Sequence, residues 1–315
     1  TNHSKYDRLF FHIKHNKICK DVQERYNIQD YSLIHAHSLF SNGYIAMRLK
    51  RDYGMPYVVA VRNTDVNVFF KYMIHLRRLG VKILRNAKKI IFISVPYKEY
   101  TIDNIVPEKY KEEIKNKSIV LPNGIDEFWF DNKINRKERL ENNELKIIYV
   151  GVINSNKNIE TTIKVCETLI EYGYSVNYIV VGQIKDNRYK DFMKKYSFIR
   201  YIPHCKKEEL ISHYRSADMF IMPSKHETFG LVYVEAMSQG LPVIYTKGQG
   251  FDGQFKEGEV GYSVQYDSAE EIAEKIELII KDYETVSKTC IEKVDRFDWN
   301  KIADKYLKIY FGIAY

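Results

Sequence analysis

Short apolar runs of strand length alternate with helical patterns along almost the whole chain. The runs that predict strands are residues 7–13, 31–37, 57–62, 89–94, 118–122, 145–150, 175–181, 198–202, 219–222 and 242–245. Helical patterns lie between them, for example at 159–172, 208–216, 230–239 and 269–283. Continuous Val/Ile runs separated by helices are typical of parallel sheets covered on both faces. The pattern therefore predicts an α/β fold of two doubly wound domains.

The apolar periodicity stops in one place, residues 126–144, where Asn, Asp, Lys and Glu dominate. A strand, a glycine turn and a helix follow directly, as at the opening of a second Rossmann-like domain. We predict a first domain over 1–140, a second over 141–297 and a terminal segment over 298–315. The length of 315 residues fits two ordinary domains.

Composition excludes several classes of protein. Hydrophobic residues make up 45% and charged residues 29% of the chain, close to the globular average, which excludes disordered and fibrous proteins. No apolar run approaches the roughly 20 residues of a membrane-spanning helix. The four cysteines form no CxxC pair and no cluster with metal-ligand spacing. Residues 1–10 lack the apolar centre of a signal peptide. We expect a cytoplasmic protein with reduced thiols and no metal site.

Lys and Arg exceed Asp and Glu by 49 to 41, a formal charge of +8, which favours anionic partners. The most basic stretch is 71–89, KYMIHLRRLGVKILRNAKK, which contains no acid. Its apolar residues recur at roughly helical spacing. Two interpretations remain open: a basic amphipathic helix on an anionic membrane surface, or a domain helix that packs its apolar stripe on a sheet and leaves its cations solvated.

The chemistry of a binding site is concentrated in 226–244, HETFGLVYVEAMSQGLPVI. A buried strand precedes it, and a helix from about Gly230 to Gln239 is predicted, with Gly240 suited to its C-cap. In open α/β sheets, ligands bind at the carboxyl ends of the strands. The loop 225–229 lies there, and its amides at a helix N-terminus suit an electronegative ligand.

Glu227 and Glu235 are the two carboxylates of this stretch. A separation of eight residues leaves about 80° of rotation on a helix, so both can face one crevice. The alternative is that Glu227 only balances the helix dipole and Glu235 is a solvated helix position. Gly230 permits close backbone approach, which favours a ligand site.

Residues 223–243, PSKHETFGLVYVEAMSQGLPV, resemble the donor-site signature of GT-B glycosyltransferases of the large retaining family 4, also called glycosyltransferase group 1. Weaker matches follow in the family's order: IHAH at 34–37, LPNGID at 121–126, VGVINSNK at 150–157, RSADMFIMPS at 215–224 and FDWNKI at 297–302. The resemblance covers nearly the whole chain from about Tyr31. It implies the GT-B fold: two Rossmann-like domains facing an interdomain cleft, with the C-terminal helix crossing back to the acceptor-side first domain.

The resemblance also implies the roles of individual residues. Glu227 and the backbone of 229–231 would hold the hydroxyls of the transferred sugar, and Glu235 the ribose. Lys157 would neutralise the diphosphate as the glycosidic bond breaks, a form of electrostatic stabilisation. Glu227 and Lys157 are the implied catalytic residues. The full donor-binding set is Gly151, Val152, Lys157, Glu227, Thr228, Phe229, Gly230, Leu231 and Glu235.

The implied function is a retaining transfer of a hexose from a nucleotide-diphosphate sugar to a saccharide or lipid-linked acceptor, in polysaccharide or glycoconjugate biosynthesis. The nucleotide-sugar is a substrate, so we expect no cofactor, and the chain has no DxD triad to hold a metal. The alternatives are a GT-B nucleotide-sugar epimerase, a glycogen-synthase-like enzyme, or a non-catalytic protein that binds nucleotide-sugar or nucleic acid. Because aromatic and basic residues are not interleaved as in an RNA platform, we expect no nucleic-acid partner.

Two departures from the family concern the phosphate and acceptor sites. Val152 stands where many relatives carry Arg, so Lys225 or Lys247 is the candidate for the missing cation. Arg62 stands where many relatives carry His. The expected acceptor-side residues are therefore His37, Arg62 and Asn63.

Three further expectations follow. Strand alternation puts His35 and His37 on one face, and one of them is expected to be only a packed histidine. The stretch 247–253, KGQGFDG, resembles a flexible loop over the donor sugar. Relatives open with a strand, a glycine-rich loop and a helix, whereas this chain has no glycine before Gly43. We therefore expect a chain that is incomplete at its N-terminus.

Overall fold

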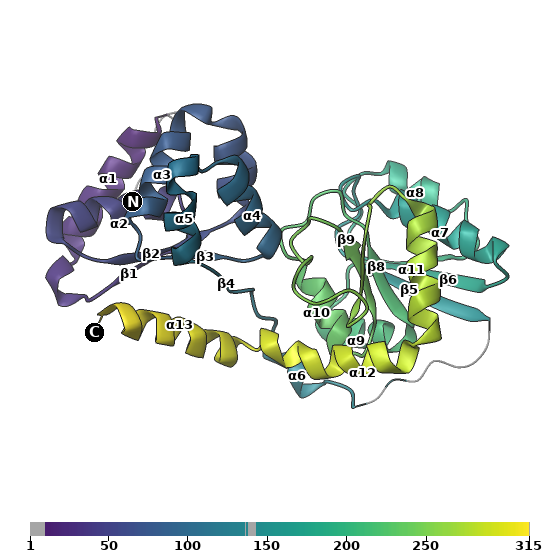
Figure 1. Cartoon of the computed structure of the whole chain (residues 1–315). Helices are drawn as coiled ribbons and strands as arrows, with labels where there is room; N and C mark the ends of the chain where they lie inside the picture. The colour runs from purple at the N-terminus through teal and green to yellow at the C-terminus, as the bar shows by residue number, and fades with distance from the viewer. Residues whose placement is uncertain (1–9, 136, 138–142, 315) are drawn as a thin grey trace. The chain divides into compact units, whose positions relative to one another are not determined.

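Two parallel β-sheets with flanking helices make up the residues that the computed structural model describes, 10–135, 137 and 143–314 (Figure 1). They belong to two compact units. Unit 1 comprises Thr1–Pro122 and Ala303–Tyr315, and unit 2 comprises Asn123–Ile302. The parallel strands and the alternating helices confirm the predicted α/β class with two Rossmann-like domains.

The sheet of unit 1 has four strands in the order β1-β2-β3-β4, all parallel. The strands are β1 (Ile34–Ala36), β2 (Tyr57–Val61), β3 (Lys89–Phe92) and β4 (Ser118–Val120). The helical segments are α1 (Phe11–Arg25), η2 (Ile28–Asp30), α2 (Ser41–Tyr53), η3 (Asp65–Phe70), η4 (Ile74–Leu76), α3 (Arg77–Asn86), α4 (Val95–Asn104) and α5 (Glu108–Lys117). All five residues of β2 are buried, as expected for a sheet that helices cover on both faces.

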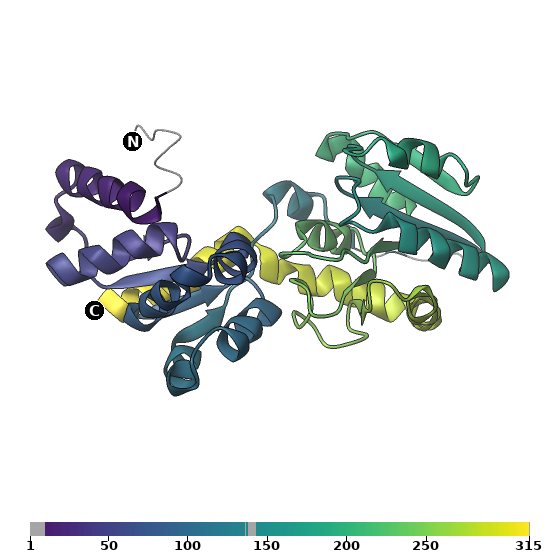
Figure 2. The ribbon, with the colours of Figure 1, turned by 90° about the horizontal axis from the view of Figure 1, so that it is seen from above.

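The last helix, α13 (Trp299–Ala314), contributes to both units, because the boundary falls between Ile302 and Ala303. Its apolar residues after that point pack on the sheet of unit 1 (Figure 2). The contacting residues are Val58, Ile91 and Leu121 on the unit 1 side and Tyr306, Ile309, Tyr310 and Ile313 on α13. The later part of the terminal segment therefore completes the core of unit 1.

Unit 2 has six parallel strands in the order β10-β9-β8-β5-β6-β7. They are β5 (Glu144–Val150), β6 (Ser175–Val181), β7 (Ile199–Ile202), β8 (Met219–Met222), β9 (Val243–Thr246) and β10 (Gly261–Val264). The helices are α6 (Glu127–Asp131), α7 (Ile159–Glu171), α8 (Arg188–Met193), α9 (Lys207–Ser216), α10 (Leu231–Ser238), α11 (Ala269–Lys281), α12 (Tyr283–Lys293) and η5 (Val294–Phe297). Counted from β5, this is the strand order of the Rossmann fold. The order reverses between β5 and β8, and ligands bind beyond the carboxyl ends of the strands at such a point.

Two predicted elements were wrong. The structure has a helix, α1, where the expected strand 7–13 ends, and residues 7–9 of that strand lie outside the described part. Phe11, His15 and Cys19 recur every four residues and face inward, which is a helical period. Strand β10 was missed because its sequence, GYSV, has no apolar run.

The domain boundary also lies earlier than the expected 140/141, since Asn123 already belongs to unit 2. Residues 123–135 are held there by backbone and ring contacts. The Ile125 amide donates to the Phe297 carbonyl at 3.1 Å, and the Trp129 and Tyr214 rings pack edge to face. The polar composition of 126–144 did not reveal these contacts.

Candidate functional site

The turn after β5 begins the site in unit 2. Gly151 has a φ of 155°, a backbone conformation that residues with a side chain rarely adopt. The Tyr149 hydroxyl donates to the Val152 carbonyl at 2.9 Å. The Asn154 carboxamide oxygen accepts hydrogen bonds from the backbone amides of Asn156 and Lys157 at 3.0 and 3.1 Å. This side-chain-to-backbone turn is a local arrangement that Asn favours. It fixes the direction in which Lys157 leaves the turn.

Asn158 joins this turn to helix α7 and adopts the left-handed conformation, with φ of 58°. Asn tolerates that conformation better than most residues do. Its buried amide donates to the Pro223 carbonyl at 3.0 Å and to the Tyr266 carbonyl at 2.5 Å. The start of α7 is thus tied to the segment that follows β8.

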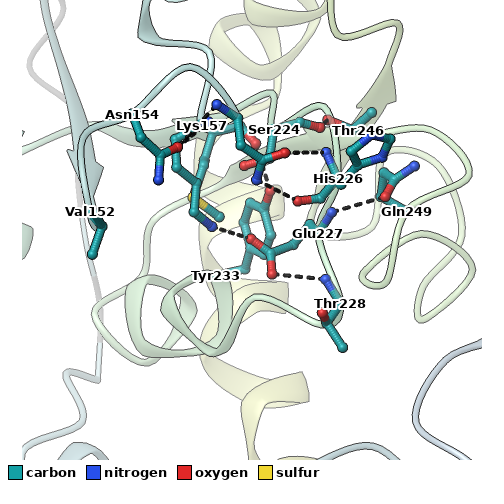
Figure 3. Close-up of polar contacts among 12 residues, drawn as sticks. Val152, Asn154, Lys157, Ser224, His226, Glu227, Thr228, Tyr233, Thr246 and Gln249 are labelled. Carbon is teal, nitrogen blue, oxygen red and sulfur yellow. Dashed lines mark hydrogen bonds and ion pairs between the residues drawn. The ribbon is translucent and has the colours of Figure 1, made fainter. Parts of the chain in front are cut away.

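Lys157 and Glu227 form an ion pair with 2.5 Å between Lys157 Nζ and Glu227 Oε2 (Figure 3). Their side chains are only 20% and 12% exposed. The other carboxylate oxygen, Glu227 Oε1, accepts from the Thr228 amide at 2.9 Å. Two residues that the sequence analysis assigned to different parts of the donor therefore meet directly, across 70 residues of chain.

Asn156 holds the loop that carries Glu227. Its side chain accepts from the His226 amide at 3.1 Å and donates to the His226 carbonyl at 2.9 Å. Its own carbonyl accepts from the Lys225 amide at 2.8 Å. The sequence analysis missed Asn156. Its place in the motif-like turn 150–157, one residue before Lys157, is the signal that was available.

The glycine-rich stretch 247–253 is bonded to this same loop. The Gly250 amide donates to the Glu227 carbonyl, and the Glu227 amide donates to Gln249 Oε1, both at 2.9 Å. A β-carbon at Gly250 would lie 1.8 Å from the Thr228 carbonyl oxygen, so only glycine fits there. The stretch packs against the backbone beside Glu227, and its role as a loop over a donor sugar stays a prediction.

Helix α10 starts as expected at the glycine of the signature. Gly230 is its N-cap residue with φ of 76°, and a β-carbon there would lie 2.4 Å from the Tyr233 ring. The Tyr233 hydroxyl donates to the Met222 carbonyl at 2.6 Å and fixes the helix against the end of β8. The exposed Leu231 begins the helix, and Phe229 is buried with its ring against those of Phe251 and Phe297.

Glu235, on α10, lines a pocket of about 570 Å³ at the carboxyl ends of β5 and β6. The other lining residues include Gly151, Val152, Gln183 and Lys207. Burial raises the pKa of the Glu235 carboxyl to about 7, against the opposing effect of a hydrogen bond from the Tyr214 hydroxyl. A carboxyl that ionises near neutrality inside a pocket is a marker of a binding or catalytic site.

The structure therefore arranges the predicted donor residues in two adjacent groups. Gly151, Val152 and Glu235 line the pocket, whereas Lys157 and Glu227 form the ion pair outside that lining. The turn 151–158 connects the two groups. The two carboxylates do not line the same pocket, although both lie beside this one turn.

The two cations proposed to replace the family's Arg are both exposed. Lys225 comes directly before His226, in the loop that Asn156 holds, and Lys247 opens the glycine-rich stretch after β9. Both positions are at the carboxyl ends of strands of unit 2, as the hypothesis requires.

The predicted acceptor-side residues lie at the carboxyl ends of β1 and β2 in unit 1. The Arg62 guanidinium donates to the His37 carbonyl at 3.3 Å, and Asn63 follows directly. His35 and His37 share a face, with ring centroids 4.0 Å apart. The Tyr310 hydroxyl lies 2.6 Å from His35 Nδ1. Burial, with His37 and Arg62 nearby, lowers the pKa of His35 to about 4, so this histidine is neutral and packed.

Asp65 holds this group together and was missed. Its buried carboxylate accepts three backbone hydrogen bonds, from Leu39 at 3.0 Å, Phe40 at 3.1 Å and Arg62 at 2.9 Å. The loops after β1 and β2 are therefore anchored on one side chain. An acid three residues after a strand end was the only signal in the sequence.

The basic stretch 71–89 folds as η4, α3 and the start of β3, not as one helix. Val81, Ile83 and Leu84 of α3 are buried in the core of unit 1. The domain-helix interpretation thus accounts for the apolar stripe. It leaves the exposed cations and the exposed residues before α3 without a role.

No group of three or more potential metal ligands occurs among the described residues. The helices in the described ranges include none that is long and apolar enough to cross a membrane.

Comparison with known proteins places the chain among sugar-transferring enzymes. The family model for glycosyl transferases group 1 matches residues 130–296, just over half of the chain. The chain is 30% identical over 194 residues to sulfoquinovosyl transferase SQD2 of Arabidopsis thaliana, covering 58% of this chain and 37% of that protein. It is 33% identical over 209 residues to the capsular polysaccharide biosynthesis glycosyltransferase CapM of Staphylococcus aureus, covering 62% of this chain and 53% of that protein. The chain thus spans about a third to a half of these two relatives.

Among solved structures, the HepE protein of Anabaena in complex with UDP is similar, with a TM-score of 0.68 and 16% identity. The alignment covers 95% of this chain and 82% of HepE. A likeness at this identity concerns the fold, and it confirms the predicted GT-B fold.

Proposed function

Because the chain belongs to the glycosyl transferases group 1 family, we propose that it is a retaining, metal-independent hexosyltransferase. It moves a hexose from a nucleoside-diphosphate sugar to a saccharide or lipid-linked acceptor. The relatives support this proposal, since one is named for transfer of sulfoquinovose and another for capsular polysaccharide biosynthesis. The alternatives of a non-catalytic binder or a nucleic-acid partner find no support in this family.

The observation that carries the proposal is the ion pair between Lys157 and Glu227. The turn after β5 delivers the lysine and the loop after β8 delivers the carboxylate, both beside the reversal point of the sheet. A diphosphate is a stronger partner for Lys157 than a carboxylate is, because it carries more charge. Its arrival releases Glu227 Oε2 to accept a hydrogen bond from a sugar hydroxyl, while Oε1 stays on the Thr228 amide.

The nucleoside occupies the pocket lined by Glu235. Its volume of about 570 Å³ is in the range of small-ligand sites. Glu235 accepts a hydrogen bond from a ribose hydroxyl, and Gly151 allows the pyrophosphate to approach the backbone. The likeness to HepE supports this placement, because the HepE structure was solved in complex with UDP.

In the proposed reaction, the bond between the anomeric carbon and the phosphate oxygen breaks as the acceptor oxygen bonds to the same face of that carbon. The acceptor proton passes to the departing phosphate oxygen, so no protein nucleophile is needed. Lys157 stabilises the charge that develops on this phosphate. Acceptor contacts come from His37, Arg62 and Asn63 of unit 1.

We place the enzyme in the cytoplasm, at the inner face of the membrane, as a peripheral protein. The exposed cations of 71–89 support this placement, and so does the involvement of one relative in capsular polysaccharide biosynthesis.

The test is a panel of nucleoside-diphosphate sugars screened by thermal shift. The donor that stabilises the protein is then incubated with and without acceptor saccharides, and the anomeric configuration of the product is read by NMR. Stabilisation by one donor, slow hydrolysis and a product of unchanged configuration are expected without added metal. An inverted product, a strict metal requirement or a panel without any stabilising donor would overturn the proposal.

A further inference from the structure

A basic groove lies on unit 1, between α3 and the connection from α4 to α5. Its volume is about 600 Å³. The cations in its lining are Arg77, Arg78, Lys82, Arg85 and Lys109, and its apolar floor includes Val81 and Ile105. We call this cavity the basic groove. None of its lining residues has a role in the sugar transfer proposed above.

Arg77 ties the start of α3 to the Phe70 carbonyl at 2.6 Å, but Arg78 and Lys82 are not needed to hold the helix in place. The helix is anchored by Ile83 and Leu84, which are fully buried. Arg78 and Lys82 are exposed and form no ion pair with any residue that the structure describes. Like charges held this close repel one another, which destabilises the compact state unless an anion is present.

Arg85 is the most constrained cation of the groove. Its guanidinium carbon lies 3.7 Å from the centre of the Tyr110 ring, and its Nε donates to Glu113 Oε2 at 3.2 Å. Glu113 also pairs with Lys117 at 2.7 Å, so one carboxylate is shared by two cations. The stacked guanidinium keeps its remaining N–H groups available, and such planar donors suit a phosphate.

An exposed apolar tip precedes the groove. Residues 71–75 are all exposed, and Tyr72 and Ile74 are 69% and 64% exposed. Ile74 lies three and four residues before Arg77 and Arg78, in helical segments that follow each other directly. Residues at this spacing lie on the same side of a helix. The apolar tip therefore continues the face that carries the cations.

We propose that this face docks on an anionic lipid bilayer, with a headgroup phosphate in the basic groove and Tyr72 and Ile74 in the interfacial layer. Either signal alone gives weak attachment, and the combination of apolar insertion with basic residues gives stable peripheral binding. Tyrosine is suited to the interface because its ring is apolar and its hydroxyl is polar. The inference deepens the proposed peripheral location and makes no use of the donor site.

The test is sedimentation with vesicles of phosphatidylcholine, with and without 30% phosphatidylglycerol. Arg78→Gln/Lys82→Gln removes two groove cations. Lys20→Gln/Lys115→Gln removes the same charge from exposed positions of unit 1 outside the groove and outside 71–89. Tyr72→Ser/Ile74→Ser removes the apolar tip. Urea unfolding of every variant checks that unit 1 stays folded. Nucleoside-diphosphate affinity, which we assign to unit 2, is measured as well, and an unchanged value separates this proposal from that of sugar transfer.

The wild type is expected to bind the anionic vesicles at least tenfold more tightly than the neutral ones. Each charge near the membrane contributes about fivefold, so the groove variant should lose about 25-fold and the control variant clearly less. Apolar insertion is not screened by salt, so part of the wild-type binding should persist in 0.5 M NaCl. The tip variant should lose this salt-resistant part. Equal losses in the groove and control variants, an inert tip, no preference for anionic vesicles, or binding of RNA in place of vesicles would each overturn the proposal.

Discussion

At the scale of single residues, the contact between Lys157 and Glu227 decides what each can do. The two side chains hold each other in a site that is largely closed to water. Removing one partner of such a pair leaves the other charge poorly solvated. The donor is expected to exchange this contact for two new ones, so the two residues should respond differently to substitution.

Glu227→Gln separates binding from catalysis. The amide still accepts from Thr228 but no longer competes for Lys157, so nucleoside-diphosphate affinity should stay the same or rise. Sugar transfer should fall by about 10- to 150-fold, because a hydrogen bond to a charged group contributes about 1.5–3 kcal/mol. Calorimetry and initial rates measure the two effects. A parallel loss of both would show that Glu227 serves only the structure.

The raised pKa of Glu235 predicts that both the free energy of unfolding and nucleoside affinity depend on pH. Its pKa of about 7 lies above the ordinary value of 4.5, so the folded state holds a proton that the unfolded state has lost between these values. The free energy of unfolding should therefore fall as pH rises from about 4.5 through 7 because of this group. Ionised Glu235 is also the better acceptor for a ribose hydroxyl.

Nucleoside binding, free of phosphate titration, should consequently tighten between pH 6 and pH 8. Titration calorimetry at several pH values measures it, with Glu235→Gln as the control that should show a flat profile. A wild-type profile as flat as that of the control would remove Glu235 from the ribose site.

The residue scale also shows the limit of inference from sequence. Glu227 and Gly230 could be singled out because they belong to one dense local motif, and Lys157 because it lies in a weaker motif that precedes it in the family's order. Asn156 and Asp65 were missed because their partners lie 70 and 25 or 26 residues away. The place of Asn156 beside Lys157 and the place of Asp65 after a strand end are local signals, but neither identifies the distant partner.

At the scale of elements, the proposed donor site depends on how the loops after β8 and β9 fit together. Gly250 meets the backbone of Thr228 too closely for any side chain. Gly248, in the same loop, has open space around it but a φ of 73°. The two glycines therefore separate a steric effect from a purely conformational one.

Gly250→Ala should displace the loop that carries Glu227 and weaken binding of the nucleotide-sugar at least tenfold. It should also destabilise unit 2 by about 1–3 kcal/mol, as overpacking does. Gly248→Ala should lower the free energy of unfolding by about 1 kcal/mol, because alanine must then adopt a left-handed backbone conformation. It should leave donor affinity nearly unchanged. Urea unfolding and calorimetry measure both. Equal donor affinity in the two variants would contradict the proposed fit of the loops.

Elements were predictable where hydrophobic period and length agreed, as in β5, β6 and α7. They were not predictable where a short segment carries few apolar residues, as in β10. Helix α1 was mistaken for a strand because only its first apolar residues were weighed, before the spacing of four from Phe11 to Cys19 becomes visible.

At the scale of the whole molecule, the two α/β domains followed from alternating strands and helices. The boundary between the domains could not be predicted in this way. It depends on the hydrogen bond from the Ile125 amide to the Phe297 carbonyl in unit 2, which joins distant parts of the chain. All the predicted donor residues lie in unit 2. The strand order of this unit explains that, because the loops at its reversal point all lie at the carboxyl edge of the sheet.

The central claim is that unit 2 binds a nucleoside diphosphate with Lys157 on the phosphates. With Val152 where relatives carry Arg, Lys157 has no cationic neighbour in the turn 150–157. Calorimetry of the full chain with the matching nucleoside diphosphate, and with its nucleoside, isolates the phosphate contribution. The control is Lys164→Ala, which removes an exposed lysine of α7.

Lys157→Ala should weaken nucleoside-diphosphate binding by at least tenfold, the lower end of a charged hydrogen bond of about 1.5–3 kcal/mol. Nucleoside affinity and the Lys164→Ala variant should be unchanged. If Lys157→Ala binds the diphosphate as tightly as the wild type, the assignment of the phosphate site is wrong.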